Sequence, residues 1–211
     1  MSDRMQVVLA TRNLGKAREF GRLLGDAFII EVLPEGIELP PEDGLTFREN
    51  ARKKAEAVYA ALGGKKAVLA DDSGLEVDAL GGQPGVRSAR FAGDGASDKD
   101  NVDKLLREMV GRTDRSARFV CALCLVLPPE EGDESPTGLV VEASGVCTGT
   151  LTERPRGGQG FGYDPIFVPG GWELTLAEAS SEQKDAVSHR GAAVRALLAS
   201  LRQKGLMRSG S

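Results

Sequence analysis

The sequence predicts an α/β protein with a mixed sheet. Segments that read as strands alternate along the chain with segments whose apolar residues recur at helical spacing. Glycine- and proline-rich turns separate them, and no internal repeat or clear linker divides the chain. A length of 211 residues suits one generous α/β domain or two modest lobes.

The first third of the chain predicts two strands and two helices. A strand over 5–10 leads through a polar turn into a helix over 17–24, and a second strand follows at 27–33. After an acidic, proline-rich loop, Thr46 and Glu49 have the spacing of a capping box. We therefore expect a helix from Phe47 that ends at Gly63-Gly64.

The remaining elements follow from the same patterns. A short buried strand is expected at 67–70, a turn at 81–85, a helix at 98–110 and long strands at 117–127 and 139–150, joined by a surface connection at 128–138. A glycine-dense loop at 157–162 precedes the last helix, 188–201, and residues 204–211 are expected to form a flexible tail.

Composition excludes some classes of function. Lys and Arg number 27 against 31 Asp and Glu, a formal charge of −4, so no global basic field exists and we expect no nucleic-acid partner. The apolar run at 7–10 is too short for a signal peptide or a membrane span, and no other stretch approaches membrane length. We therefore expect no membrane partner and a cytoplasmic location.

The three cysteines favour a structural interpretation. Cys121 and Cys124 have C-x-x-C spacing, but they lie in a predicted buried strand, where odd spacing points side chains to opposite faces. Cys147 stands apart, so no second pair could complete a metal site. We expect all three to act as small hydrophobic residues.

The turn at 11–16 is suited to phosphate. It joins a strand to a helix, and backbone N–H groups at a helix N-terminus face an anion there. Lys16 adds a positive charge, and Thr11 and Asn13 add neutral donors. The turn has no Walker A pattern, and Thr and Asn also cap helices routinely, so the alternative is an ordinary cap.

The run Asp71-Asp72-Ser73-Gly74 is the main candidate for chemistry. It follows an apolar strand, where α/β proteins place ligands, and adjacent carboxylates repel unless a cation or proton relieves them. Mg²⁺ is the economical cation, because it prefers a few carboxylates with water and phosphate oxygens. Glu42 and Asp43 are further ligand candidates. The alternative is a polar turn capped by the aspartates.

Downstream residues suit a planar base. An aromatic pair among glycines at 161–164 could stack on a base, although it could also be a core-filling turn. Lys184, His189 and Arg190 gather hydrogen-bond donors nearby in sequence, although a lone histidine is more often structural. Earlier in the chain, Glu49, Asn50, Lys53 and Lys54 share a helix face that spacing alone cannot distinguish from a solvated one.

Five ordered motifs together resemble the inosine triphosphate pyrophosphatase family, whose members are also called XTP/dITP diphosphatases. They are T-x-N-x-x-K at 11–16, E-N-A-x-x-K-A at 49–55, A-D-D-S-G-L-x-V-D-A-L-x-G-x-P-G at 70–85, F-G-Y-D-P-x-F at 161–167 and S-H-R-G at 188–191. The resemblance spans residues 5 to about 201, nearly the whole chain.

The resemblance implies a fold and an activity. The fold is an elongated mixed sheet with flanking helices, a single domain over 1–203 whose two lobes surround a central nucleotide cleft, usually in a homodimer. The activity is magnesium-dependent hydrolysis of ITP, dITP and XTP to the nucleoside monophosphate and pyrophosphate, which cleanses the nucleotide pool.

It also implies roles for matching residues. Asp72 would be the general base, and it would bind Mg²⁺ with Glu42, for which Asp43 is a fallback. Some relatives carry a lysine near Ala89, a charge that Arg90 would supply here. The substrate-binding residues would be Thr11, Arg12, Asn13, Leu14, Gly15, Lys16, Lys54, Ser73, Arg90, Phe161, Gly162, Tyr163, Asp164, Lys184, His189 and Arg190.

The expected chemistry is attack of water at the α-phosphate, since no serine or cysteine pairs with a base. Donors at Lys184, His189 and Arg190 favour a 6-keto purine over adenine, which presents an amino donor there. Two alternatives remain open. One is a related pyrophosphatase for pyrimidine or modified triphosphates, as in the septum-formation inhibitor family, and the other is a nucleotide sensor without turnover.

Overall fold

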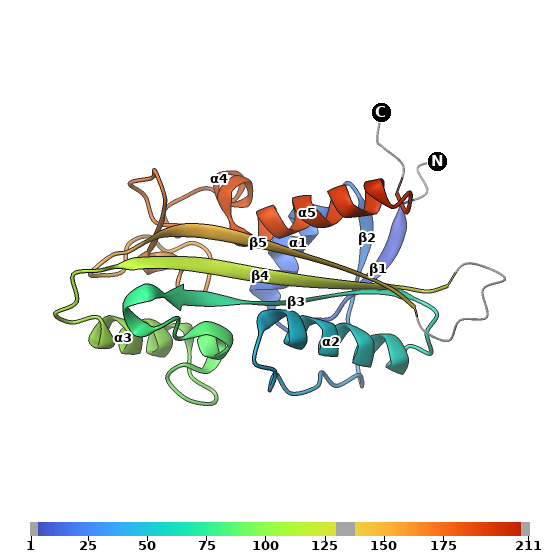
Figure 1. Ribbon diagram of the computed structural model, residues 1–211, viewed down its shortest axis with the longest axis horizontal. Helices are drawn as coiled ribbons and strands as arrows, with labels where there is room; N and C mark the ends of the chain where they lie inside the picture. The colour runs from blue at the N-terminus through green and yellow to red at the C-terminus, as the bar shows by residue number, and fades with distance from the viewer. Residues whose placement is uncertain (1–3, 130–137, 208–211) are drawn as a thin grey trace. The chain divides into compact units, whose positions relative to one another are not determined.

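The computed structural model describes residues 4–129 and 138–207. Its strands form one six-stranded sheet in the order β2-β1-β3-β4-β5-β6 (Figure 1). The strands are β1 (Met5–Leu9), β2 (Phe28–Val32), β3 (Ala67–Val77), β4 (Ser116–Leu127), β5 (Leu139–Leu151) and β6 (Phe167–Pro169). The α-helices are α1 (Leu14–Leu24), α2 (Phe47–Ala61), α3 (Asp98–Glu108), α4 (Ser181–Val187) and α5 (His189–Gln203). Short 3₁₀ helices occupy Asp78–Leu80, Gly85–Arg90 and Asp164–Ile166.

The sheet is mixed, which confirms the predicted α/β class. Strand β1 pairs in parallel with β2 on one side and with β3 on the other, whereas β5 and β6 are antiparallel. Parallel neighbours require crossover connections, and the helical segments α1 and α2 lie in the connections that lead to β2 and β3.

The chain forms two compact units. Unit 1 comprises Met1–Asp72, Ala122–Gly145 and Ala193–Ser211, and unit 2 comprises Ser73–Cys121 and Val146–Ala192. The boundary falls inside β3, between the consecutive residues Asp72 and Ser73. The single domain over 1–203 stays a prediction. In the expected tail, 204–207 follow α5 as turn and bend, and 208–211 lie outside the described residues.

Unit 1 is built around the central strand β1. Val7, Val8 and Leu9 are all buried, as expected for a strand covered on both faces. Helix α2 packs with Ala51 and Val58 inward. Its predicted capping box is confirmed, because Thr46 Oγ1 accepts from the Glu49 N–H (3.1 Å) and Glu49 Oε2 accepts from the Thr46 N–H (3.2 Å).

Unit 2 has a separate apolar core. It gathers residues from β3, α3, β4, β5 and β6, including Val77, Leu105 and Phe167. Phe119 and Phe167 meet with ring centroids 4.7 Å apart and a tilt of 59°, a favourable aromatic arrangement. Helix α3 begins with a second capping box, formed by Ser97 and Asp100.

Three features differ from the sequence-based expectation. Strand β3 does not end at Ala70 but continues through Asp71-Asp72-Ser73-Gly74 to Val77. Strand β6 and helix α4 were not predicted, because one is three residues long and the other seven. Most of the expected connection at 128–138 falls outside the described residues.

The cysteine prediction is confirmed where it concerns burial. Cys121, Cys124 and Cys147 are buried, and none of them is in a disulfide. Burial raises the pKa of the Cys124 thiol to about 12 and that of Cys147 to about 11, which suits inert core residues.

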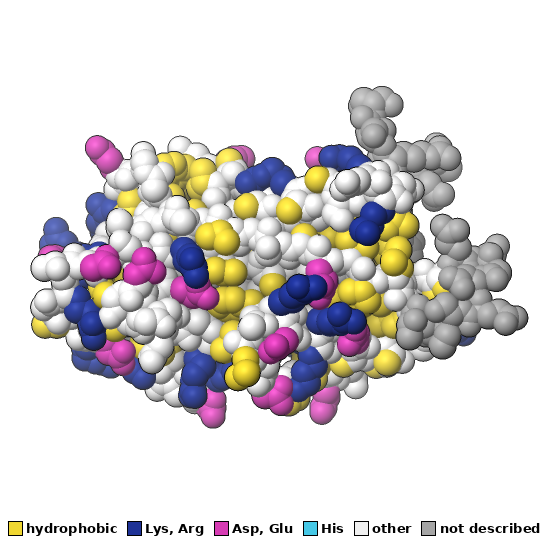
Figure 2. Space-filling model, viewed as in Figure 1, with side chains coloured by type: hydrophobic (Ala, Val, Ile, Leu, Met, Phe, Trp, Pro, Cys, Tyr) yellow, Lys and Arg dark blue, Asp and Glu magenta, His cyan; other side chains and the backbone are white. Residues whose placement is uncertain are grey.

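Charge on the molecular surface is mixed. Figure 2 shows basic and acidic side chains interspersed on the visible face, with hydrophobic side chains between them. In the part of the chain that the structure describes, no helix is long and apolar enough to cross a membrane.

Candidate active site

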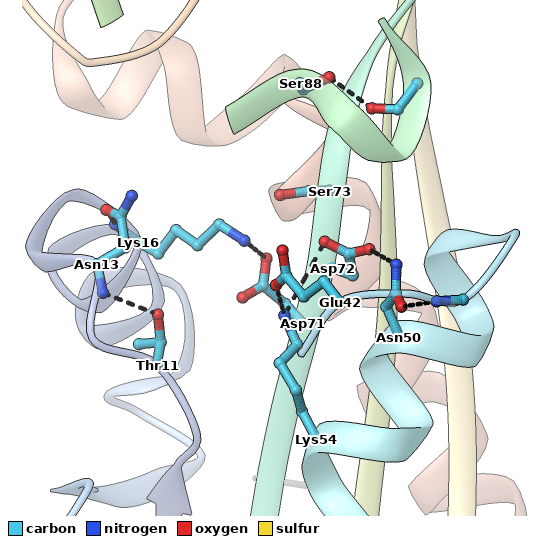
Figure 3. A network of polar contacts seen from close by, with 12 residues as sticks. Thr11, Asn13, Lys16, Glu42, Asn50, Lys54, Asp71, Asp72, Ser73 and Ser88 are labelled. Atoms are coloured by element: carbon cyan, nitrogen blue, oxygen red, sulfur yellow. Dashed lines mark hydrogen bonds and ion pairs between the residues drawn. The ribbon is translucent and has the colours of Figure 1, made fainter. Parts of the chain in front are cut away.

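The turn after β1 has the geometry of a helix start. Thr11 Oγ1 accepts from the Asn13 N–H (3.1 Å), and Asn13 Oδ1 caps α1 by accepting from the Lys16 N–H (3.0 Å). Thr11, Asn13 and Lys16 thus all lie at the N-terminus of α1, as the sequence predicted, and the Lys16 side chain extends from there toward Asp71 (Figure 3). Both acceptors belong to side chains that the sequence analysis assigned to phosphate. The structure shows them as helix caps, and their role toward phosphate stays a prediction.

Asp71 and Asp72 lie beyond the end of β1, although they are inside β3. The last register pair of the two strands is Leu9 with Leu69, and the Ala10 N–H still donates to the Leu69 carbonyl (2.8 Å). Strand β3 then continues past the last residue of β1 to Val77. The expectation that the aspartates end their own strand is wrong, but they do occupy the carboxyl edge of the neighbouring parallel strand, where α/β proteins place ligands.

The buried Asp71 carboxylate faces the turn after β1. Its Oδ2 forms an ion pair with Lys16 Nζ at 2.7 Å, and its side chain is 1% exposed. A buried carboxylate needs such a partner, because desolvation of an isolated charge is costly. Lys16 therefore connects the N-terminal turn to the acidic run.

Lys54 connects the other two acids. Its Nζ lies 2.5 Å from Glu42 Oε1 and 3.9 Å from Asp72 Oδ1. Burial lowers the pKa of Lys54, but the charges of Asp71, Glu42 and Asp72 outweigh it, so the net pKa is raised. For Glu42, burial raises the pKa, but Lys54 and Lys16 together lower it by more than that, so the net pKa lies below its ordinary value. Glu42 and Lys54 are thus a charged pair.

Asp72 is the acid in this group whose pKa is raised. Burial is the largest cause, the charge of Glu42 adds to it, and together they outweigh Lys54, Lys16 and the Asn50 hydrogen bond, so that the pKa reaches about 6. Asn50 Nδ2 donates to Asp72 Oδ2 at 2.9 Å (Figure 3). A carboxylate whose pKa approaches neutrality is suited to accept a proton in catalysis.

The acidic cluster (Glu42, Asp71 and Asp72) fits a hard divalent cation. Three carboxylates lie among two lysines, Lys16 and Lys54, so the group has one more acid than it has bases. The described residues form no ready-made group of three or more His, Cys, Asp or Glu ligands. Mg²⁺ does not need one, because it binds through one or two carboxylates completed by water and phosphate oxygens.

In unit 2, Asp164 organises the glycine-rich loop. Its Oδ2 accepts from the Phe161 N–H (2.9 Å) and pairs with Lys184 Nζ (2.5 Å), and both side chains are buried. Gly160 has a φ of +76°, and a Cβ there would lie 2.1 Å from Asp164 Oδ2. Only glycine fits this close approach.

The Phe161 ring lies beside two cations. Lys184 Nζ is 5.0 Å from its centroid and Arg190 Cζ is 4.8 Å from it. Arg190 also donates to Ser73 Oγ at 2.9 Å. The structure therefore brings Ser73, predicted to touch the substrate, together with three of the residues predicted to line the base and sugar site: Phe161, Lys184 and Arg190.

Other predicted residues of unit 2 lie deeper. The Tyr163 hydroxyl donates to the Ser88 carbonyl (2.9 Å), and burial raises its pKa. His189 is 1% exposed and stacks on Phe119, with centroids 4.6 Å apart and an interplanar angle of 10°. The Gly162 N–H donates to Asp98 Oδ2 (2.7 Å). These three contacts hold the loop and the start of α5.

Several predicted residues have other surroundings. Arg12 donates to the carbonyls of Leu33, Pro34 and Ile37 at 2.8–3.0 Å, so it holds the loop that leads toward Glu42. Leu14 is exposed, and Arg90 ends the Gly85–Arg90 3₁₀ helix, half-buried. Asp43, the fallback ligand, pairs with Lys53 at 2.6 Å on the surface.

Asn50 belongs to the site, although the sequence reading left it on a solvated face. It is 1% exposed and contacts Asp72. A usable signal was its position four residues before Lys54, which places the two side chains on one side of α2.

An α/β protein that gathers acids and lysines at the carboxyl edge of parallel strands belongs to the broad class of α/β enzymes. Comparison with known proteins narrows this class: the model of the Ham1 family matches residues 7–200, and the chain belongs to that family.

Curated relatives agree over most of the chain. The dITP/XTP pyrophosphatase of Methylacidiphilum infernorum is 46% identical over 198 residues, which cover 92% of this chain and 93% of the relative. The dITP/XTP pyrophosphatase of Bacillus cereus is 48% identical over 204 residues, 93% and 95% of the two chains.

Solved structures share the fold. The Ham1 protein of Staphylococcus aureus superposes with a TM-score of 0.79 at 39% identity, covering 94% of this chain and 99% of that one. A Mycobacterium abscessus structure described as a nucleoside-triphosphatase and dITP/XTP pyrophosphatase has a TM-score of 0.69 at 40% identity, covering 95% and 100%.

Proposed function

We propose that this chain hydrolyses the non-standard purine nucleoside triphosphates ITP, dITP and XTP to the monophosphate and pyrophosphate. The observation that carries the proposal is the buried Asp72 carboxylate, with a pKa of about 6, held beside Lys54 and Asn50 in a member of the Ham1 family. The names of the curated relatives, dITP/XTP pyrophosphatase, support the substrate class.

The phosphate chain would bind in unit 1. Lys16 and Lys54 supply two positive charges, and the N-terminus of α1 adds backbone donors beside Thr11 and Asn13. Both lysines are held by carboxylates in the described structure, so they are positioned before the triphosphate arrives.

Glu42 and Asp72 would hold Mg²⁺. Both are hard oxygen donors, and both contact Lys54. The ion would neutralise charge on the phosphate oxygens when it is bound.

Asp72 would act as the general base. It would take a proton from a water molecule as the water oxygen forms a bond to the α-phosphorus, while the bond from the α-phosphorus to the bridging oxygen breaks and pyrophosphate leaves with that oxygen. The proton on Asp72 then returns to solvent. Lys16 and Lys54 would stabilise the charge that develops on the departing pyrophosphate.

The base would bind in unit 2, against Phe161 and the donors Lys184 and Arg190. Ser73, which contacts Arg190, directly follows Asp72 in β3, so the two sets of residues are joined by one peptide bond. A 6-keto oxygen accepts hydrogen bonds from such donors, whereas the adenine amino group opposes them, at a cost of about 1–3 kcal/mol for each unmatched donor. His189 would help to form the base site by fixing the start of α5, next to Arg190, because its ring is stacked on Phe119.

The variant Asp72→Asn tests catalysis against mere binding. It keeps the shape of the side chain but removes its capacity to accept a proton, so turnover of ITP should fall by at least about 1,000-fold while ITP binding persists. A nucleotide sensor would show no ITP turnover in the wild type either. If Asp72→Asn hydrolysed ITP as fast as the wild type, Asp72 could not be the general base.

A panel of triphosphates separates the purine substrates from the alternative class. Activity confined to dTTP or UTP would assign the chain to pyrimidine nucleotides instead.

Two properties of the whole protein complete the proposal. We propose a homodimer, on the strength of the family resemblance, and light scattering in solution tests it. We also propose a cytoplasmic location, because three buried cysteines that form no disulfide suit a reducing compartment. Microscopy of a tagged chain tests it.

A further inference from the structure

We infer that Asn50 is a positioning residue for the proposed reaction: it fixes the Asp72 carboxylate and ties it to the loop that carries Glu42. The inference rests on the proposed function and adds a residue to it. Asn50 is 1% exposed and lies in the second turn of α2, so its side chain has a defined place.

The two ends of the Asn50 amide have different partners. Oδ1 accepts from the Gly44 N–H at 2.8 Å, and Nδ2 donates to Asp72 Oδ2 at 2.9 Å. Because a backbone N–H can only donate, it fixes which end of the amide is the oxygen, and the NH₂ group must then face Asp72. Asparagine meets both demands, whereas aspartate could satisfy only the first.

The Gly44 contact links Asn50 to Glu42. Gly44 follows Glu42 by two residues, and a Cβ at Gly44 would lie 2.7 Å from Asn50 Oδ1. The backbone therefore approaches the amide as closely as a glycine allows. Lys54, one turn after Asn50, bridges the same two acids through its charge. Figure 3 shows Asn50, Lys54, Glu42 and Asp72 converging in this way.

This arrangement has a consequence for catalysis. Glu42 is carried by a loop, and loops have more freedom than helices and strands. Asn50 holds the backbone of this loop, and Lys54 holds the Glu42 carboxylate. Both residues belong to α2, so this helix fixes the position of Glu42, and through Asn50 it also fixes Asp72. Loss of the amide should therefore change how Glu42 and Asp72 act together on Mg²⁺ and water, with less effect on how the nucleotide itself binds.

The test compares Asn50→Asp with Asn101→Asp. Asn101 is a matched control: it is 3% exposed, it also follows a capping box by one residue in α3, its Oδ1 accepts from the Ala92 N–H (2.8 Å), and its Nδ2 donates to the Ala89 carbonyl (3.2 Å). Both variants keep the acceptor and replace the donor with a carboxylate, but only Asn50 faces Asp72.

We expect Asn50→Asp to lower kcat for ITP by about 30-fold or more and to raise the Mg²⁺ concentration for half-maximal rate at least about 3-fold, with KM for ITP within about 3-fold of wild type. Asn101→Asp should leave the half-maximal Mg²⁺ concentration unchanged. Gly44→Ala displaces the Asn50 amide without removing a polar group from the chain. It should move kcat and the Mg²⁺ requirement in the same direction as Asn50→Asp, and it replaces that variant as the test if Asn50→Asp does not fold.

The outcomes separate the two proposals. A wild-type protein without ITP hydrolysis would overturn the proposed function and the role of Asn50 with it. If the wild type is active but Asn50→Asp has an unchanged Mg²⁺ requirement, the positioning role alone is overturned. If Asn50→Asp is unfolded, the same result in Gly44→Ala overturns it.

Discussion

At the scale of single residues, the site is a set of buried and half-buried charges that pair with one another. Asp71 faces Lys16, Glu42 faces Lys54, and Asp72 faces both Lys54 and Asn50. Each of these acids would be costly to bury alone, because a carboxylate that loses its hydration without gaining a partner raises the free energy of the folded state. The same pairs keep both lysines in place for a polyphosphate, so stability and binding depend on the same side chains.

Lys16→Met separates these two roles. The change removes the cation that the buried Asp71 carboxylate faces, so the free energy of unfolding should fall by about 3 kcal/mol, measured by denaturant titration. The double variant Lys16→Met/Asp71→Asn removes the buried charge as well and should regain most of that stability. Its KM for ITP should nevertheless stay at least about 10-fold above wild type, because the phosphate partner is gone. A double variant with wild-type KM would show that Lys16 serves the fold alone.

The residue scale is also where sequence reading reached its limit. The motifs predicted Thr11, Asn13, Lys16, Lys54 and Asp72 as site residues, and in the structure both lysines lie beside carboxylates. Asn50 could not be separated from a solvated helix face, since its burial depends on Asp72 and Gly44, which are distant in sequence. Arg12 was grouped with the phosphate turn, but its guanidinium reaches carbonyls 21–25 residues away.

At the scale of elements, the long strand β3 is the main departure from expectation. Asp, Ser and Gly are turn formers in isolation, so the run at 71–74 suggested that the strand ends there. In the structure the polar side chains find partners on other elements, Asp71 with α1, Asp72 with α2 and Ser73 with α5, and the backbone continues as a strand. Tertiary contacts thus outweigh local propensity. The helices that begin with capping boxes were predicted well, because a cap is local in sequence.

The loop at 157–162 provides a test at this scale. Gly160→Ala would place a methyl group against Asp164 Oδ2 in a backbone conformation that alanine disfavours by about 1–2 kcal/mol. We expect a lower melting temperature and at least a 10-fold higher KM for ITP, because Asp164 holds both Phe161 and Lys184. Gly158→Ala, where a Cβ meets open space, is the matched control and should behave as wild type in both assays. Equal behaviour of the two variants would rule out an organising role for Asp164.

At the scale of the whole molecule, each unit has its own set of functional groups. The acidic cluster, with Lys16 and Lys54, belongs to unit 1. Phe161, Lys184 and Arg190 belong to unit 2, and the boundary falls in β3 between Asp72 and Ser73. The fold class and the order of most elements were predictable from hydrophobic periodicity. The division inside a continuous strand was not, since no linker or change of composition marks it.

The buried thiols report on the integrity of this core. Burial raises the pKa of Cys124 to about 12 and that of Cys147 to about 11, so little reactive thiolate exists at these two positions near neutral pH. A thiol reagent such as Ellman's should label the native protein slowly and all three cysteines rapidly in denaturant. Rapid native labelling of three thiols would contradict the buried strands described here.

The central claim is that the chain is a magnesium-dependent purine triphosphate pyrophosphatase. Its most direct test is the measurement of products from ITP, XTP, GTP and ATP with and without Mg²⁺. We predict release of pyrophosphate and monophosphate from ITP and XTP only when Mg²⁺ is present, with kcat/KM at least about 100-fold above that for ATP. Release of single phosphate with a diphosphate product, equal rates for ATP, or full activity without a divalent cation would contradict it.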